Sequence, residues 1–393
     1  MPNNLKVKVA NKNIGNIFVE NEKYIFSYIH ENNINQNDFI SLTMPVRNEQ
    51  YINNQLHPIF EMHLPEGYLL SIIKKHFSKI TKTDDFGLLK LMSSSINGRV
   101  TYDTNSIKKN NALDLDELLN PKKDNLFEEL VSRFALTSSL SGVQPKVLAT
   151  IKNKATLKYD DYIVKSWGDE YPQLALNEYY CMKIVQLANI EVPEFYISSD
   201  DKLFIMKRFD IKDNNIKLGF EDMCVLHAKQ RDNKYEGTYE QIVKTIKIFV
   251  SPKNKKSSLK QFFKMIVINN IIQNGDAHLK NFGLIYNDIN NIKLSPAYDV
   301  VCTTVYIKND IPALNLLGSK KWWDKKYLFR FGIESCDLSN GEVNKLYDEC
   351  INATLQIKVE IKNRIKDETN ESKLLILNHL NSILSKLFNY NYL

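Results

Sequence analysis

Three polar side chains in the second half of the chain have the types and order that phosphoryl transfer requires. Asp276 is followed five residues later by Asn281, and Asp299 comes further downstream. In kinase-type chemistry an aspartate orients the hydroxyl nucleophile and accepts its proton, while an asparagine five residues on and a later aspartate hold Mg²⁺ against the nucleotide phosphates. The spacing therefore predicts Asp276 as the catalytic base, with Asn281 and Asp299 as Mg²⁺ ligands.

The segment 274–283 that carries the first two of these residues is predicted to be a loop between two regular elements. Before it, apolar residues recur at helical spacing from Phe262 to Ile272, and after it residues 284–286 have the pattern of a short strand. A buried helix and a strand would thus position a cluster of polar, ionisable side chains.

The sequence Asn-Gly-Asp-Ala-His-Leu-Lys-Asn-Phe-Gly at 274–283, followed by Leu-Ser-Pro-Ala-Tyr-Asp-Val at 294–300, resembles the catalytic and metal-binding segments of the HipA family, the Ser/Thr protein kinase toxins of bacterial toxin–antitoxin pairs. The resemblance runs from about residue 5 to the last helices. It implies a serine/threonine protein kinase that uses ATP and Mg²⁺. Nucleotide contacts are assigned to His278, Lys280 and Tyr298, although His278 could instead shape the loop.

A Ser/Gly-containing segment lies between a helix predicted at 126–136 and a strand predicted at 147–151. Such a loop can offer backbone N–H groups to a phosphate, but with one glycine a plain loop is the default interpretation of these residues alone. The resemblance implies a phosphate-covering loop, in which Ser139 is autophosphorylated to switch the kinase off and Ser141 is a second candidate hydroxyl. The implied nucleotide-binding residues are Ser141, Gly142, Val143, Gln144 and Lys146. Pro145 departs from the acidic residue common in the family and removes one N–H.

Lys165 lies near the end of a strand predicted at 161–167. A lone strand lysine is ordinarily an exposed edge residue, but its place after the loop and its likeness to the family's nucleotide lysine favour contact with the phosphates. Glu178, in a helix predicted from 177 to 187, either pairs with Lys165 or is a first-turn acid favoured by the helix dipole. The resemblance further implies a hinge whose backbone holds the adenine ring, formed by Lys207, Arg208 and Phe209.

Composition sets the broad class. The chain has 393 residues, of which 43% are hydrophobic and 25% charged, as in ordinary soluble proteins of several domains. No apolar run reaches the ~18 residues of a membrane span, so no membrane association is expected. Five scattered cysteines without a CxxC pair indicate a reduced, cytoplasmic protein. The net charge of +6 shows no dense basic face that would predict direct DNA binding.

The predicted architecture is α+β, with a protein-kinase-like bilobal fold. It comprises a small N-terminal α/β subdomain at 1–105, a linker at 106–125, a kinase N-lobe at 126–206 and an all-helical C-terminal lobe at 207–393. Alternating residues predict strands at 5–9 and 24–28, and helical spacing predicts closing helices at 343–365 and 374–388.

Asp85, Phe86 and Gly87 spell the metal-binding tripeptide of eukaryotic kinases, but they precede Asp276, whereas kinase order places them after it. Asp84 or Asp85 is predicted instead as the N-cap of a helix at 86–92.

Partners are implied by the resemblance alone. It implies an aminoacyl-tRNA synthetase as the protein substrate, and a HipB-like helix-turn-helix antitoxin through which operator DNA is reached only indirectly. The alternatives are a non-toxin kinase that modifies regulatory or host proteins, or a catalytically inactive nucleotide-binding interaction protein. The polar loop 229–239 is a candidate substrate-facing segment. Trp322 and Trp323 could stack on a partner, but packing inside the lobe is favoured.

Overall fold

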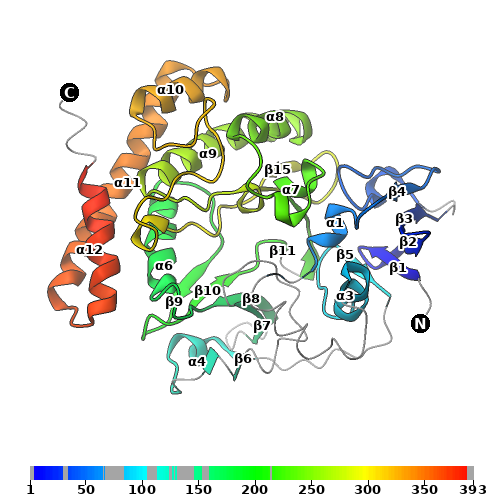
Figure 1. Cartoon of the computed structure of the whole chain (residues 1–393), viewed down its shortest axis with the longest axis horizontal. Helices are drawn as coiled ribbons and strands as arrows, with labels where there is room; N and C mark the ends of the chain where they lie inside the picture. The colour runs from blue at the N-terminus through cyan, green and yellow to red at the C-terminus, as the bar shows by residue number, and fades with distance from the viewer. Residues whose placement is uncertain are drawn as a thin grey trace. The chain divides into compact units, whose positions relative to one another are not determined.

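The structure is a computed structural model. It describes residues 4–29, 34–64, 66, 84–103, 113–123, 126–127, 129–130, 146–152, 159–212 and 215–386. The chain divides into two compact units, each assembled from three segments (Figure 1). The first unit comprises Met1–Ser166, Ile205–Asn233 and Ile285–Asn290, and the second comprises Trp167–Phe204, Lys234–Leu284 and Asn291–Leu393.

The first unit is rich in strands. Its strands are β1 (Asn4–Val9), β2 (Lys12–Glu20), β3 (Lys23–Tyr28), β4 (Tyr51–Asn53), β5 (Val100–Tyr102), β6 (Leu113–Asp114), β7 (Lys146–Lys152), β8 (Tyr159–Lys165), β11 (Ile211–Lys212), β12 (Ile216–Lys217) and β13 (Gly219–Asp222). Its helices are α1 (Pro58–Glu61), α3 (Asp85–Met92), α4 (Leu115–Leu119) and α7 (Met223–Leu226). Strands β10 (Phe204–Lys207) and β14 (Gly283–Tyr286) each have residues in both units.

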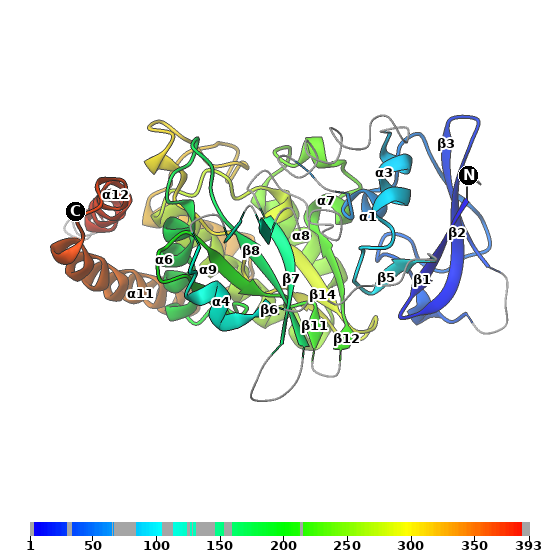
Figure 2. The ribbon, with the colours of Figure 1, turned by 90° about the horizontal axis from the view of Figure 1, so that it is seen from below.

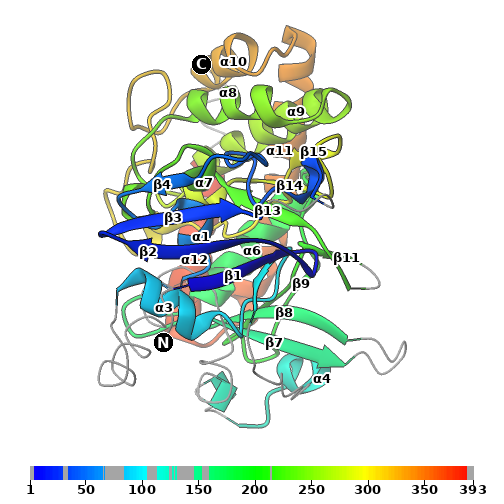
Figure 3. The ribbon, with the colours of Figure 1, turned by 90° about the vertical axis from the view of Figure 1, so that its right-hand side faces the viewer.

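The first sheet of this unit has the strand order β4-β3-β2-β1-β5, and its neighbouring strands are antiparallel. Figure 3 shows β1, β2 and β3 side by side. In β1 the side chains of Leu5, Val7 and Val9 are buried while the residues between them are more exposed. This alternation, which places every second side chain on one face, confirms the strands predicted at 5–9 and 24–28.

A second sheet contains the strand order β6-β7-β8-β10. Strands β7 and β8 are antiparallel, with Lys146 opposite Lys165 at one end of the ladder and Lys152 opposite Tyr159 at the other (Figure 2). The predicted strand at 147–151 is therefore confirmed, and β8 ends at Lys165, two residues before its predicted end.

Glu221, at the third position of β13, joins distant segments of the first unit. Its carboxylate is fully buried and accepts hydrogen bonds from the Ser41 hydroxyl (2.6 Å), the Leu42 amide (2.8 Å) and the Tyr286 hydroxyl (2.5 Å). Burial raises the pKa of Glu221, and these three donors oppose the rise. The residue is a structural connector.

The second unit is mostly helical. Its helices are α6 (Leu174–Leu187), α8 (Tyr239–Phe249), α9 (Pro252–Ile271), α10 (Lys325–Glu334), α11 (Asn340–Asp367) and α12 (Glu371–Lys386), and its short strands are β9 (Phe195–Ile197) and β15 (Ile292–Leu294). Helix α9 contacts α6, α8, α11 and β15. Its Phe262 ring packs against Phe282 (5.3 Å between centroids) and Phe331 (6.4 Å), so the apolar run predicted from the sequence forms the core.

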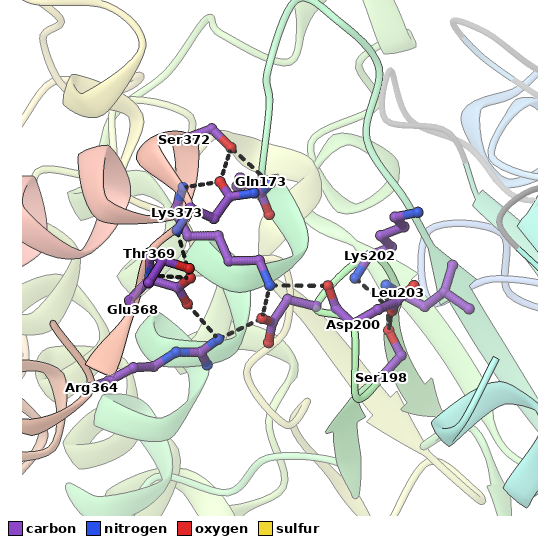
Figure 4. Close-up of polar contacts among 12 residues, drawn as sticks. Gln173, Ser198, Asp200, Lys202, Leu203, Arg364, Glu368, Thr369, Ser372 and Lys373 are labelled. Atoms are coloured by element: carbon purple, nitrogen blue, oxygen red, sulfur yellow. Dashed lines mark hydrogen bonds and ion pairs between the residues drawn. The ribbon is translucent and has the colours of Figure 1, made fainter. Parts of the chain in front are cut away.

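Helices α11 and α12 pack together, and α6 contacts both of them (Figure 1). An ionic cluster joins their connection to the turn between β9 and β10 (Figure 4). The Asp201 carboxylate, 6% exposed, forms ion pairs with Arg364 (2.5 Å) and Lys373 (2.6 Å). The Lys373 ammonium also donates to the Asp200 carbonyl oxygen (3.3 Å). We call Asp201, Arg364 and Lys373 the Asp201 clamp.

The mixed α/β class is as predicted, but the expectation of an all-helical lobe from residue 207 onward is too simple. Strands β11 to β15 lie within that range because Ile211, Ile216 and the residues of β13 to β15 form short paired segments. Helix α3 is capped as predicted, since the Asp84 carboxylate accepts from the Gly87 amide (2.7 Å).

Two further expectations concern the whole composition. All five cysteines are buried thiols, in agreement with structural rather than disulfide-forming roles. Within the described ranges no helix combines the length and apolar character that a bilayer crossing needs.

Candidate active site

The predicted catalytic loop, residues 274–283, leaves the end of α9 through a sharp turn. Gln273 adopts a left-handed backbone conformation (φ 55°), and the Asn274 amide donates back to the Asn269 carbonyl oxygen (2.9 Å). The buried Asn274 side chain donates to Asn269 Oδ1 (2.9 Å) and accepts from the Asp276 amide (3.1 Å). Helix α9 therefore fixes the backbone on which Asp276 is mounted.

Among the residues that the structure describes, one carboxylate oxygen of Asp276 accepts a hydrogen bond and the other does not. The Tyr235 hydroxyl donates to its Oδ1 (2.7 Å), and His278 Nε2 lies 3.9 Å from the same atom. Half of the Asp276 side chain is exposed. Desolvation raises its pKa, the Tyr235 hydrogen bond opposes this, and the negative charge of Asp299 adds to the rise. A carboxylate with a raised pKa and a half-exposed side chain is suited to accept a proton.

His278 is neutral. Its side chain is only 7% exposed, and burial together with Lys234 lowers its pKa to about 3. The Tyr235 ring packs edge-on against it, with 5.1 Å between the centroids. Its buried Nδ1 has no hydrogen-bond partner within the part of the chain that the structure describes. A bound polar group would satisfy that atom.

Asn281 and Asp299 lie together. Asn281 Nδ2 donates to Asp299 Oδ2 (3.0 Å), and Asn281 Oδ1 accepts from the His278 amide (3.0 Å). Asp299 adopts a left-handed conformation (φ 59°), a strained geometry for a residue with a side chain and one that is typical of ligand sites. The two residues predicted as metal ligands are thus adjacent although they are eighteen positions apart in the sequence.

The chemistry of this pair fits Mg²⁺. Amide and carboxylate oxygens are the hard ligands that Mg²⁺ prefers, and the ion ordinarily takes only one or two carboxylates beside phosphates and water. Among the described residues no group of three or more His, Cys, Asp or Glu side chains is arranged to hold a metal. The pair therefore suits an ion delivered with a nucleotide better than a protein-only metal cage.

The segment that carries Asp299 is held by its backbone. The Ser295 amide donates to the Gly283 carbonyl (2.9 Å), and the Ala297 amide donates to the Glu191 carbonyl (2.7 Å). Tyr298 in turn donates its hydroxyl to the Lys280 carbonyl oxygen (2.7 Å). Lys280 and Tyr298, both predicted to contact nucleotide, are accordingly linked to each other within the site.

The first unit assembles a separate group of predicted residues. Lys146 and Lys165 are directly opposed in the β7–β8 ladder, so both side chains emerge on the same face, and Lys165 is 3% exposed. Lys207 pairs with Asp160 (3.1 Å). Lys146 and Lys165, two cations on one face of the sheet, are suited to anionic phosphates.

The predicted hinge residues have partners of their own. The Arg208 side chain pairs with Asp210 (2.5 Å), and its amide donates to the Asp161 carbonyl (2.9 Å), so that amide is already used. Phe209 packs edge-on against Phe220 (5.3 Å). The loop residues Ser139, Ser141, Gly142, Val143 and Gln144 lie outside the described residues, as does Pro145.

One alternative for Glu178 is wrong. Helix α6 begins at Leu174, not at residue 177, because apolar Leu174, Ala175 and Leu176 extend it. Glu178 therefore lies in the second turn, fully buried, and is not a first-turn acid. Its pairing with Lys165 stays a prediction.

Sequence reasoning missed the residues that support Asp276. Tyr235 lies in the loop predicted to face substrate, but its link to Asp276 has no sequence pattern. Asn274 belongs to segment 274–283, but its type and position alone do not predict that it supports Asp276. Packing is confirmed for Trp323, which is 9% exposed and contacts Tyr327 (4.8 Å between centroids).

Comparison with known proteins gives consistent matches. The family described as HipA-like C-terminal domain matches residues 138–357, and that described as HipA N-terminal domain matches residues 5–103. The protein named Putative kinase Y4dM, from Sinorhizobium fredii, is 28% identical over 293 residues, which are 68% of each chain. One named Putative kinase, from Haemophilus influenzae, is 30% identical over 204 residues, or 47% of this chain and 59% of that protein.

A solved structure shares the fold. It is the complex of the Shewanella oneidensis toxin–antitoxin system HipA, HipB and its operator DNA. The matched chain superimposes with a TM-score of 0.73, covers 99% of this chain and 97% of its own length, and is 17% identical.

Proposed function

Because the chain belongs to the HipA family, whose relatives named above are kinases by name, we propose that it transfers the γ-phosphoryl group of Mg-ATP to a serine or threonine hydroxyl of a protein. The observation that carries this proposal is the grouping of Asp276, Asn281 and Asp299 around one loop. Hydroxyl activation and metal binding are the roles that phosphoryl transfer asks of these three residue types.

In the proposed reaction Asp276 orients the acceptor hydroxyl and takes its proton. Asn281 and Asp299 would hold Mg²⁺, which when bound offsets the negative charge of the phosphates. Lys146 and Lys165 would contribute positive charge to the nucleotide phosphates, as their shared face supports. Neutral His278 cannot act as a cation there and is better suited to a neutral hydrogen bond or to shaping the loop.

The remaining nucleotide contacts are proposed from the family pattern. They are those of Ser141, Gly142, Val143 and Gln144 in the phosphate loop, Lys207, Arg208 and Phe209 at the hinge, and Lys280 and Tyr298 in the catalytic region. We also propose Ser139 or Ser141 as the site of autophosphorylation. The division into subdomain, linker and two lobes is likewise a proposal.

The proposed biological role is that of a toxin whose target is an aminoacyl-tRNA synthetase, so that phosphorylation inhibits translation and growth. The Shewanella complex, which holds HipA, HipB and operator DNA, supports a HipB-like antitoxin as partner. Operator DNA would then be reached only through the antitoxin. Five buried thiols are consistent with the reducing cytoplasm where such a target is found.

Intact-mass measurement and peptide mapping after incubation with Mg-ATP test the kinase proposal. We expect phosphate on the peptide that spans residues 138–141 in the wild type. Asp276→Asn should slow its appearance by several orders of magnitude, because positioning and electrostatics carry most of this catalysis. Asp348→Asn, an exposed substitution on α11, is the matched control and should behave as wild type.

The outcomes separate the competing roles. Full phosphorylation by Asp276→Asn would show that the base is wrongly assigned. A wild type that binds ATP and gains no phosphate would be a nucleotide-binding interaction protein. Growth arrest on expression, relieved by Asp276→Asn, would distinguish a toxin from a kinase of another pathway.

A further inference from the structure

The Tyr235 side chain makes two contacts with the catalytic loop. Its hydroxyl donates to Asp276 Oδ1 (2.7 Å), and its ring packs edge-on against His278 with an interplanar angle of 79°. His278 in turn places Nε2 3.9 Å from the same Asp276 oxygen. Tyr235 and His278 thus both approach the same carboxylate oxygen of Asp276.

The backbone beside Tyr235 is fixed to the same loop. The Lys234 carbonyl oxygen accepts from the Leu279 amide (3.0 Å), and Leu279 is fully buried at the start of the 3-10 turn that ends in Asn281. Two residues on, the Gly237 carbonyl accepts from the Asn315 amide (3.3 Å). Backbone hydrogen bonds on both sides of Tyr235 therefore fix its position beside the loop.

The second oxygen of Asp276 is left open. Oδ2 forms no hydrogen bond with any residue that the structure describes, and half of the side chain is exposed. Because a carboxylate has two oxygens, a hydroxyl can approach Oδ2 while Tyr235 keeps its bond to Oδ1. Oδ1 is thus occupied by the Tyr235 hydroxyl, whereas Oδ2 is available to an acceptor hydroxyl.

We propose that Tyr235 is a positioning residue of the phosphoryl-transfer site: its hydroxyl holds Asp276 Oδ1 and so directs Oδ2 at the acceptor hydroxyl. This inference rests on the proposed kinase function. The Tyr235 hydrogen bond also opposes the rise in the pKa of Asp276 that desolvation causes. The Tyr235 hydrogen bond therefore orients the carboxylate and favours its ionised form.

Tyr235→Phe is the direct test because it removes the hydroxyl and keeps the ring that packs on His278. Autophosphorylation of the full chain is followed by intact mass as a function of Mg-ATP concentration. We expect the maximal rate to fall about 10- to 100-fold, since small displacements of a catalytic group cost this much. The half-saturating ATP concentration and the melting temperature should stay close to those of wild type.

Two further proteins make the result interpretable. Tyr196→Phe removes a hydroxyl whose one hydrogen bond among the described residues is to exposed Glu194, and it should leave both kinetic parameters unchanged. Asp276→Asn defines the activity left without the base. If Tyr235→Phe merely loosened the fold, its melting temperature and its ATP dependence would change together with the rate.

Three results would overturn the inference in distinguishable ways. A Tyr235→Phe protein with the wild-type maximal rate would show that the hydroxyl does not position Asp276. A faster Tyr235→Phe protein would show that the tyrosine blocks the acceptor position. A wild type without activity would overturn the proposed kinase function itself, and this inference with it.

Discussion

Gly275 stands between Asn274 and Asp276, where a side chain has no room. A Cβ on Gly275 would overlap the Asp310 carboxylate and come within 2.8 Å of Thr303 Oγ1, the atom that accepts from the Gly275 amide (2.7 Å). A side chain here would require Asp310 and Thr303 to move, so their close approach favours glycine in the path that leads to Asp276.

Gly275→Ala should therefore misplace Asp276. We expect phosphoryl transfer to slow about 10- to 100-fold, and overpacking to destabilise the protein by about 1–3 kcal/mol. Autophosphorylation rates and thermal unfolding measure the two effects. Gly341→Ala in α11, where no atom lies within 4 Å of the added Cβ, is the control. Wild-type turnover by Gly275→Ala would mean that the loop accommodates the methyl group without moving the carboxylate.

At the residue scale, sequence spacing predicted the candidate metal ligands but not the side chain that contacts Asp276 from a distant loop. Asn281 and Asp299 could be singled out because their types and order reflect a chemistry, and the structure brings them within a hydrogen bond. Tyr235 could not be singled out, since its bond to Asp276 joins residues forty-one positions apart and a lone loop tyrosine has no pattern. Residues that orient a catalytic group are brought together by the tertiary structure, and short-range spacing does not reveal them.

Among the elements, the Asp201 clamp ties the end of α11 and the start of α12 to the turn after β9. Removing Asp201 would leave the Arg364 and Lys373 charges side by side with little solvent, since they are 28% and 17% exposed. Breaking a fully buried pair costs about 3–5 kcal/mol. Partial exposure reduces this, so we expect Asp201→Ala to lower the free energy of unfolding by about 2–3 kcal/mol.

Chemical denaturation would measure that loss. Glu360→Ala provides the comparison. Glu360 of α11 forms an ion pair with Lys183 of α6 (2.6 Å) in the same unit, but its side chain is 43% exposed. An exposed pair of this kind contributes about 0–1 kcal/mol. Equal losses for the two variants would refute the view that burial makes the clamp important.

Helix boundaries show why periodicity alone is incomplete. The last two helices were predicted at 343–365 and 374–388, where apolar residues recur. Helix α11 begins earlier, at Asn340, because Ser339 and Glu342 form a capping box that stabilises a polar first turn. Helix α12 likewise begins at Glu371, before its first apolar residue. Polar caps extend helices beyond the apolar pattern that reveals them.

Across the whole molecule, two part-buried histidines make stability sensitive to acid. Burial lowers the pKa of His57 and of His63 to about 4, against about 6.5 in an unfolded chain. Between these values the unfolded chain binds protons that the folded chain does not, so this contribution is complete above pH 6.5 and is lost as pH falls toward 4. Each histidine should cost up to about 1.4 kcal/mol per pH unit in that window.

Thermal unfolding at pH 7.5, 6.5 and 5.5 would measure this slope. His57 accepts from the Ile59 amide at the start of α1, and asparagine can take over that cap without titrating. His57→Asn should therefore flatten the decline below pH 6.5 relative to wild type. An unchanged slope would mean that His57 does not cause the acid sensitivity in this pH range.

The interleaved units also set an order of events during synthesis. Glu221 of β13 is buried with Ser41, Leu42 and Tyr286 as its donors. A chain growing from its N-terminus produces Ser41 long before Tyr286, by an interval on the order of tens of seconds at about 5–20 residues per second. Until Tyr286 emerges, the carboxylate lacks one of its donors. The first unit therefore cannot finish folding before residues 167–204 and 234–284 of the second unit have been translated, and the nascent chain must wait with part of its core unassembled.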